Sequence, residues 1–254
     1  MLPADFIFSQ NNLQNYVDCK QRFYLEHIVG LDWPAVQTEP VLLQEERMAA
    51  GSEFHLLCNR FFCGIPIESI GESISNTQLL RWWESFIALG LSPSSNALSE
   101  KTLTIPFHGY RLTAKLDLLV KEGKNKFIIY DWKTNAKRPS QLSAQNKMQT
   151  IVYPVTLKSY QKQILGENER FIDITMIYWY PEFPDQPHRF HFSEEQLDHQ
   201  ENELLSLLKE ISETPLDGFF FTDEVKKCAF CHYRSYCNRG QNAGESDEEP
   251  FTEE

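Results

Sequence analysis

Residues 101–134, KTLTIPFHGYRLTAKLDLLVKEGKNKFIIYDWKT, form three apolar-rich runs separated by two turn-like segments. The first turn is His108-Gly109, and the second is KEGKNK at 121–126. The second run alternates polar and apolar side chains, and a period of two is typical of a strand with one buried face. The pattern predicts three antiparallel strands. Along the second strand, the residues expected on one face are Leu112, Ala114, Leu116, Leu118 and Val120.

Helical patterns flank these strands on both sides. Apolar spacing predicts helices over 10–27, 42–62 and 76–89 before them, and over 140–160 and 193–212 after them. A fourth strand is expected at 171–180. The predicted fold class is therefore α/β, with antiparallel strands plus a helix and a further strand, wrapped by N- and C-terminal helices.

Length and charge bear on domain organisation. The chain has 254 residues, 41% of them hydrophobic, which suits one domain over residues 1–241. Residues 242–254 are expected to form an acidic, disordered tail, because the last ten residues contain six acids and no base. The net charge is −12, or −6 without those six acids, which argues mildly against tight non-specific DNA binding. A local positive surface matters more for that purpose than the total.

Two carboxylates and a lysine suggest chemistry. If the second turn is centred on Lys124, antiparallel pairing places Asp117 opposite Asp131. Opposed like charges destabilise a sheet unless something such as a divalent cation lies between them. Lys133 lies two residues beyond Asp131 and so projects from the same face. A metal with an ammonium beside it suits phosphodiester hydrolysis. A two-residue loop at 123–124 would instead separate the aspartates, leaving an exposed Asp131–Lys133 pair.

These residues carry a resemblance. Asp117 followed by DWKT at 131–134 resembles the core of the PD-(D/E)XK nuclease superfamily, most closely its RecB-like branch. GSEFH at 51–55 resembles that branch's Gly-x-x-x-His element, and QTIVY at 149–153 its Gln-x-x-x-Tyr element. The resemblance runs from about Ser9 to Cys237 and implies a restriction-endonuclease-like core. Ala114 departs from it, because the branch usually has glycine there.

The resemblance also implies roles for individual residues. The implied ligands of Mg²⁺ or Mn²⁺ are His55, Asp117, Asp131 and the Trp132 carbonyl. The implied catalytic set is Asp117, Asp131 and Lys133, with Gln149 and Tyr153 facing the active site.

The segment KKCAFCHYRSYC places Cys228, Cys231 and Cys237 within ten residues. In a reducing compartment, clustered thiols more often bind metal or do chemistry than form disulfides. Members of the same branch with an iron–sulfur cluster, such as AddB-type proteins and the CRISPR adaptation exonucleases, have one early cysteine and a Cys-x2-Cys-x5-Cys set. The resemblance therefore implies a [4Fe–4S] cluster bound by Cys19, Cys228, Cys231 and Cys237.

Such a cluster would close almost the whole chain into one loop and so restrict the unfolded ensemble. Zinc is the alternative, held by the four thiolates or by three of them with His232. Cys58 and Cys63 are expected to be buried small hydrophobic residues.

The sequence thus predicts a metal-dependent DNA nuclease, an exonuclease on single strands or DNA ends. The alternatives are a non-catalytic module that binds DNA or a partner, and a zinc-stapled acidic adaptor. A basic groove could include Lys137, Arg138 and Lys147 and the cations around the cysteines, with Trp132, Tyr233 and Tyr236 as stacking faces.

The sequence lacks a nucleotide-binding loop and any membrane-spanning or signal-like segment. No G-x4-G-K-[ST] loop is present, so a helicase or a CRISPR integrase would be a separate partner. Neither a run of about 18 apolar residues nor a signal-like start occurs, which predicts a cytoplasmic protein without membrane contact.

Overall fold

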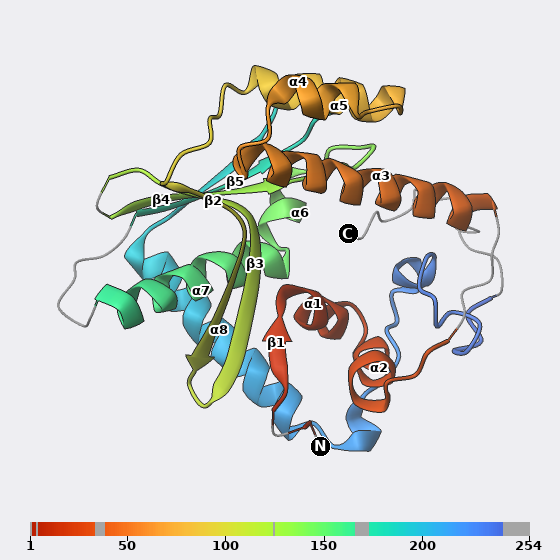
Figure 1. The fold of residues 1–254 in the computed structure, drawn as a ribbon. Coiled ribbons are helices and arrows are strands. Elements are labelled where there is room, and N and C mark those ends of the chain that lie inside the picture. The colour runs from red at the N-terminus through yellow and green to blue at the C-terminus, as the bar shows by residue number, and fades with distance from the viewer. Residues whose placement is uncertain (1, 4, 34–38, 124, 166–172, 241–254) are drawn as a thin grey trace.

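The computed structural model describes residues 2–3, 5–33, 39–123, 125–165 and 173–240. Within them, a mixed sheet lies between two layers of helices, as Figure 1 shows. The expected α/β class, a restriction-endonuclease-like sheet with flanking helices, is confirmed. The predicted tail at 242–254 lies outside the described residues.

The sheet combines antiparallel and parallel pairs. β2, β3 and β4 pair antiparallel, β5 pairs parallel to β4, and β6 pairs antiparallel to β5. The short β1 pairs parallel to β3, and neither β1 nor β6 was expected. The strands are β1 (Ile7–Ser9), β2 (Ala97–Phe107), β3 (Tyr110–Lys121), β4 (Lys126–Trp132), β5 (Asp173–Trp179) and β6 (His188–Phe192).

Helices cover both faces of this sheet. α3, α4 and α5 lie on one face, and α7 and α8 lie on the other (Figure 1). No helix in the described part of the chain is long and apolar enough to cross a membrane. The helices are α1 (Gln10–Asp18), α2 (Lys20–Phe23), the π-helix η1 (Tyr24–Val29), α3 (Glu39–Phe62), α4 (Ile67–Glu72), α5 (Thr77–Ala88), α6 (Gln141–Gln145), α7 (Met148–Leu165), α8 (Glu194–Glu213), and the 3-10 helices η2 (Leu216–Gly218) and η3 (Val225–Cys228).

Two predicted helices are interrupted. The helix expected over 10–27 breaks at Cys19, whose backbone is extended at φ −161° and ψ 111°. The helix expected over 140–160 ends at Gln145 and restarts at Met148, whose backbone N–H donates to the Gln14 side chain at 3.0 Å. In both places the helical spacing of apolar residues continues across the break in the sequence. The break itself is stabilised by contacts with other parts of the fold.

The register of β3 and β4 is the one that a turn centred on residue 124 predicts. Leu118 lies opposite Tyr130, and Lys121 lies opposite Phe127. Continuing this register by one residue places Asp117 opposite Asp131 at the end of the paired segment. The shorter loop, which would have separated the two aspartates, is excluded.

The expected single apolar face of β3 is wrong beyond Leu116. Leu112, Ala114 and Leu116 pack in the core beneath α7, whereas Leu118 and Val120 pack in the core beneath α3 and α5. The change coincides with a distortion in the neighbouring strand β2. Glu100 has a φ of +51° and lies between the pairs Ser99–Leu118 and Lys101–Leu116, opposite Asp117. The distortion therefore lies at Glu100 and Asp117, the two residues of these strands that belong to the candidate site.

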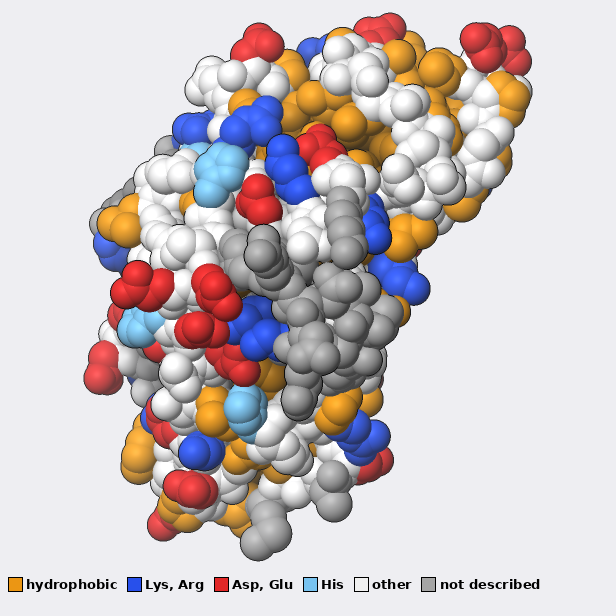
Figure 2. All heavy atoms as spheres, turned by 90° about the vertical axis from the view of Figure 1, so that its left-hand side faces the viewer, with side chains coloured by type: hydrophobic (Ala, Val, Ile, Leu, Met, Phe, Trp, Pro, Cys, Tyr) orange, Lys and Arg blue, Asp and Glu red, His pale blue; other side chains and the backbone are white. Residues whose placement is uncertain are grey.

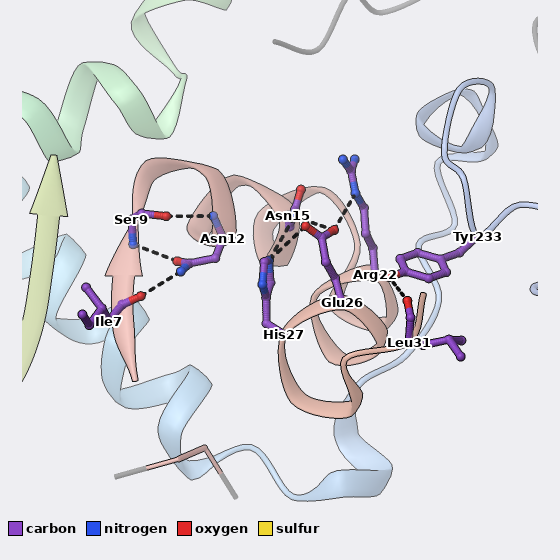
Figure 3. Close-up of polar contacts among 9 residues, drawn as sticks. All are labelled: Ile7, Ser9, Asn12, Asn15, Arg22, Glu26, His27, Leu31 and Tyr233. Carbon is purple, nitrogen blue, oxygen red and sulfur yellow. Dashed lines mark hydrogen bonds and ion pairs between the residues drawn. The ribbon is translucent and has the colours of Figure 1, made fainter. Parts of the chain in front are cut away.

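A capping box starts α1. The Ser9 hydroxyl accepts from the Asn12 backbone N–H, and the Asn12 side chain accepts from the Ser9 N–H at 2.9 Å (Figure 3). Such reciprocal caps satisfy amide groups that the first helical turn leaves without partners. Asn12 also donates to the Ile7 carbonyl at 2.9 Å, which fixes the passage from β1 into α1.

Candidate active site and cysteine cavity

Three potential metal ligands converge beside β3. The ligand atoms of His55, Glu100 and Asp117 all lie within 4.8 Å of one another. Nδ1 of His55 lies 3.2 Å from Oδ1 of Asp117, and Lys115 forms an ion pair with Glu100. Two carboxylates with one imidazole form a donor set suited to a divalent cation. The residues present therefore fit Mg²⁺ or Mn²⁺.

Glu100 is the site residue that the sequence prediction missed. It comes from β2, and its positive φ is unusual for a residue other than glycine. A signal was present, because a hairpin centred on His108-Gly109 places residue 100 opposite residue 117. The predicted ligand Asp131 is not part of this close group among the described residues.

Asp131 anchors a second group of side chains. Its Oδ1 accepts from the Gln149 amide at 2.5 Å, and its Oδ2 lies 2.9 Å from Nζ of Lys133. Lys133 also donates to Oε1 of Gln149 at 2.8 Å. The Gln149 amide lies 3.0 Å from the hydroxyl of Tyr153, one turn along α7. The structure thus brings together all four of these predicted residues.

Burial controls the charge of this second group. Only 1% of Asp131 is exposed, and burial raises the pKa of its carboxyl far above the usual range. The Lys133 ammonium opposes that rise, whereas the negative charge of Asp117 adds to it. Burial also raises the pKa of Tyr153, which therefore keeps its proton. A cation near Asp117 and Asp131 would offset the repulsion between their carboxylates.

Asp117 joins the two groups. Its Oδ2 accepts the backbone N–H of Trp132 at 2.7 Å, while its Oδ1 faces His55. Because Trp132 directly follows Asp131, this hydrogen bond links the two groups through adjacent residues. The Trp132 ring itself is 1% exposed and packs in the core, so its expected role as a stacking face is wrong.

Gly51 lets α3 come close to the end of β4. A Cβ atom at this position would lie 2.6 Å from Oγ1 of Thr134, which is buried. Thr134 directly follows Lys133, and His55 lies one helical turn beyond Gly51. The Gly-x-x-x-His spacing therefore has a steric reason: the glycine allows the close approach that presents the histidine to Asp117.

A cavity of about 690 Å³ opens beside Lys133 and Gln149. It lies within the size range of ligand sites. Figure 2 shows one face of the molecule on which acidic and basic side chains are interspersed. The lining of this cavity differs, because its charged residues are one acid, Glu26, and six cations. The cations are Arg22, Arg47, Lys133, Lys137, Arg138 and Lys147. Such a lining suits a polyanion, although the chain as a whole is acidic.

The four predicted cluster cysteines line one small cavity. Cys19, Cys228, Cys231 and Cys237 all contribute to it, together with Arg22, Arg234 and Arg239. Burial and the neighbouring thiols raise the pKa of Cys237 to about 11, and burial also raises the pKa of the Cys228 and Cys231 thiols. Four free thiols around one space form a donor set for either an iron–sulfur cluster or zinc. His232 is not among the described residues that line it.

Contacts between distant segments hold this cavity together. The Tyr233 hydroxyl donates to the Leu31 carbonyl at 2.7 Å (Figure 3), and the Trp33 indole donates to Oγ of Ser235 at 2.9 Å. In Figure 1 the blue C-terminal segment lies beside the red and orange α1 and α2. Tyr233 is 2% exposed, so its expected stacking role is wrong, whereas Tyr236 is exposed.

The two remaining cysteines differ in burial. Cys58 is fully buried, as expected, and burial raises the pKa of its thiol. Cys63 is exposed at the end of α3, so its expected burial is wrong.

A model of the PD-(D/E)XK nuclease superfamily matches residues 7–238. The chain belongs to this superfamily. No curated protein sequence matches it. The crystal structure of the "Putative exonuclease" from Eubacterium rectale is similar at 10% identity, covering 82% of each chain with a TM-score of 0.49. That of SSO0001 is similar at 15% identity, covering 93% of this chain and 88% of the other with a TM-score of 0.42.

Replacing Gly51 by alanine is expected to weaken Mn²⁺ binding by about tenfold, because the added methyl group displaces α3 and with it His55. A calorimetric titration of the protein with Mn²⁺ measures this effect. Gly71→Ala is the matched control, since a Cβ there would meet only the Trp83 ring nitrogen at an ordinary 3.8 Å. Unchanged affinity in Gly51→Ala would contradict the steric explanation.

Proposed function

We propose that this protein is a metal-dependent deoxyribonuclease that hydrolyses phosphodiester bonds, working as an exonuclease on single-stranded DNA or DNA ends. The observation that carries the proposal is that Asp117 links the candidate metal site to the group of side chains around Asp131. This one carboxylate faces His55 and is hydrogen-bonded to the residue after Asp131. A candidate metal site and a buried lysine group therefore adjoin each other.

His55, Glu100 and Asp117 would hold Mg²⁺ or Mn²⁺, with Asp131 and the Trp132 carbonyl as the further ligands that the family resemblance implies. A bound divalent cation supplies a more acidic water and offsets charge on the phosphate. The Asp117 carboxylate is held by the Trp132 N–H, so its orientation is set before any ligand arrives.

Lys133 is the proposed catalytic lysine. Its ammonium is held by Asp131 and Gln149, and only 17% of its side chain is exposed. From that position it would stabilise negative charge developing on the phosphate or orient the attacking water. Gln149 and Tyr153 would hold the lysine and the aspartate in place rather than react themselves.

The shape and lining of the large cavity support the proposed substrate. Six lining cations favour a phosphate backbone, and Lys133 and Gln149 are part of the same wall. A single strand or a frayed end can bring its backbone into an enclosed space more easily than a rigid duplex can.

We further assign the protein to the RecB-like branch with a [4Fe–4S] cluster at Cys19, Cys228, Cys231 and Cys237. Four thiols around one cavity support this assignment, and the cations beside them would offset the charge of a cluster. A cluster would tie both ends of one nuclease domain, residues 1–241, over its core. A reducing cytoplasm suits such free thiols, and a separate helicase or CRISPR integrase would supply steps for which no motif is present.

The test is cleavage of end-labelled single- and double-stranded DNA by protein purified without oxygen. We expect products with Mn²⁺ or Mg²⁺, more from single strands or ends, and none in EDTA. The product ladder gives the polarity. Binding of DNA without any cleavage in either metal would instead support the non-catalytic binding module.

A further inference from the structure

Arg138 follows β4 by a few residues and lines the cavity beside Lys133. Two hydrogen bonds fix its guanidinium. Nε donates to the Gln186 carbonyl at 2.7 Å, and Nη2 lies 2.8 Å from Nδ1 of His188. Both acceptors are uncharged groups, so the guanidinium is oriented without being neutralised.

His188 is built to accept this hydrogen bond. A guanidinium only donates, so Nδ1 of His188 must be the acceptor and its proton must sit on Nε2. Nε2 then donates to the Pro139 carbonyl at 2.9 Å. The ring is fully buried in β6 and contacts the edge of Tyr180, and burial lowers the pKa of His188. The imidazole therefore stays neutral and fixed.

The charge of Arg138 has no carboxylate partner among the described residues. A half-buried cation without a counter-ion is unfavourable unless a ligand supplies the negative charge. The planar fork of a guanidinium matches the oxygens of a phosphate, and a fork held at two nitrogens loses little entropy when it binds. Glu26, the one acid of this lining, is instead bonded to Asn15 at 3.0 Å (Figure 3).

We propose that Arg138, held by His188, is a phosphate-binding residue for the DNA strand in the cavity beside Lys133. This inference rests on the proposed function and adds a specific contact to it. Arg138 touches the substrate phosphate, and His188 is a positioning residue that acts through Arg138.

The test measures binding in EDTA, so that it does not depend on cleavage. The probe is a fluorescein-labelled oligothymidylate of about 12 nucleotides, titrated at several salt concentrations. Arg138→Gln is expected to weaken binding about tenfold and to reduce the salt slope by about 0.7. His188→Phe keeps an aromatic ring and the arginine's charge, so binding weakens by about threefold while the salt slope stays at the wild-type value.

Arg189→Gln is the matched control. Arg189 adjoins His188 on β6, but its exposed side chain projects from the opposite face. Arg138→Lys should keep the salt slope while losing affinity. No binding by the wild type, unchanged binding by Arg138→Gln, or an equal loss in Arg189→Gln would overturn the proposal. A wild type that binds but never cleaves would overturn the nuclease and leave this contact standing.

Arg138 could bind either an internal backbone phosphate or the 5′-terminal phosphate of the strand, and the choice of probe distinguishes the two. An equal loss on 5′-phosphorylated and 5′-hydroxyl strands assigns Arg138 to an internal backbone phosphate. A loss confined to the 5′-phosphorylated strand assigns it to the terminal phosphate.

Discussion

Lys133→Ala is expected to lower the rate of DNA cleavage by about 100–1,000-fold, the effect typical of removing a preorganised donor from an active site. The side chain lies 2.9 Å from Asp131 and 2.8 Å from Gln149, so its ammonium has one defined position. Single-turnover kinetics with Mn²⁺ should show the loss in the chemical step, with DNA binding in EDTA much less affected. The free energy of unfolding, measured in urea, checks that the variant is folded.

Lys126→Ala is the control for this experiment. Lys126 lies on the same strand, β4, but its side chain is 49% exposed and pairs with Glu122. It should cleave at the wild-type rate. Equal cleavage by wild type and Lys133→Ala would mean that Lys133 takes no part in the reaction or that another nuclease is present.

Cys19→Ser is expected to abolish binding of the proposed cluster and to lower the free energy of unfolding by about 2–5 kcal/mol, as for loss of a cross-link that closes a long loop. The wild type, purified without oxygen, should be brown and contain about four irons per chain. The variant should be colourless. Iron analysis, the visible spectrum and urea unfolding measure the three effects.

Cys63→Ser serves as the control because Cys63 is exposed and lies outside the cavity of the four cysteines. It should retain iron and stability. Colourless wild type with one zinc per chain would establish the zinc alternative, and full metal content in Cys19→Ser would show that Cys19 is not a ligand. His232→Ala then tests whether the histidine replaces it.

Local sequence patterns predicted the features that depend only on the pairing of neighbouring strands. The centred turn at KEGKNK was enough to place Asp117 opposite Asp131, because register follows from loop length. The same logic extends to Glu100, although charge spacing alone did not point to it. Its backbone has a positive φ, which no sequence periodicity predicts.

Other features depend on contacts between distant segments. The helix break at Cys19 lies in a segment whose apolar spacing is helical, and the interruption coincides with the cavity that Cys228, Cys231 and Cys237 share. Trp132, which follows Asp131, is one of three aromatic residues that the sequence offers as a stacking face. The ring instead fills the core beneath α3, since alternate residues of β4 point to opposite faces.

The backbone of Glu100 has a consequence for protein engineering. A non-glycine residue in the left-handed region costs about 1 kcal/mol or more, so the glutamate at position 100 strains the backbone of β2. A screen for thermal stability would therefore favour glycine or asparagine at this position. Such a variant would gain robustness by discarding a carboxylate from the centre of the candidate metal site, so stability selection alone would drive this enzyme toward inactivity.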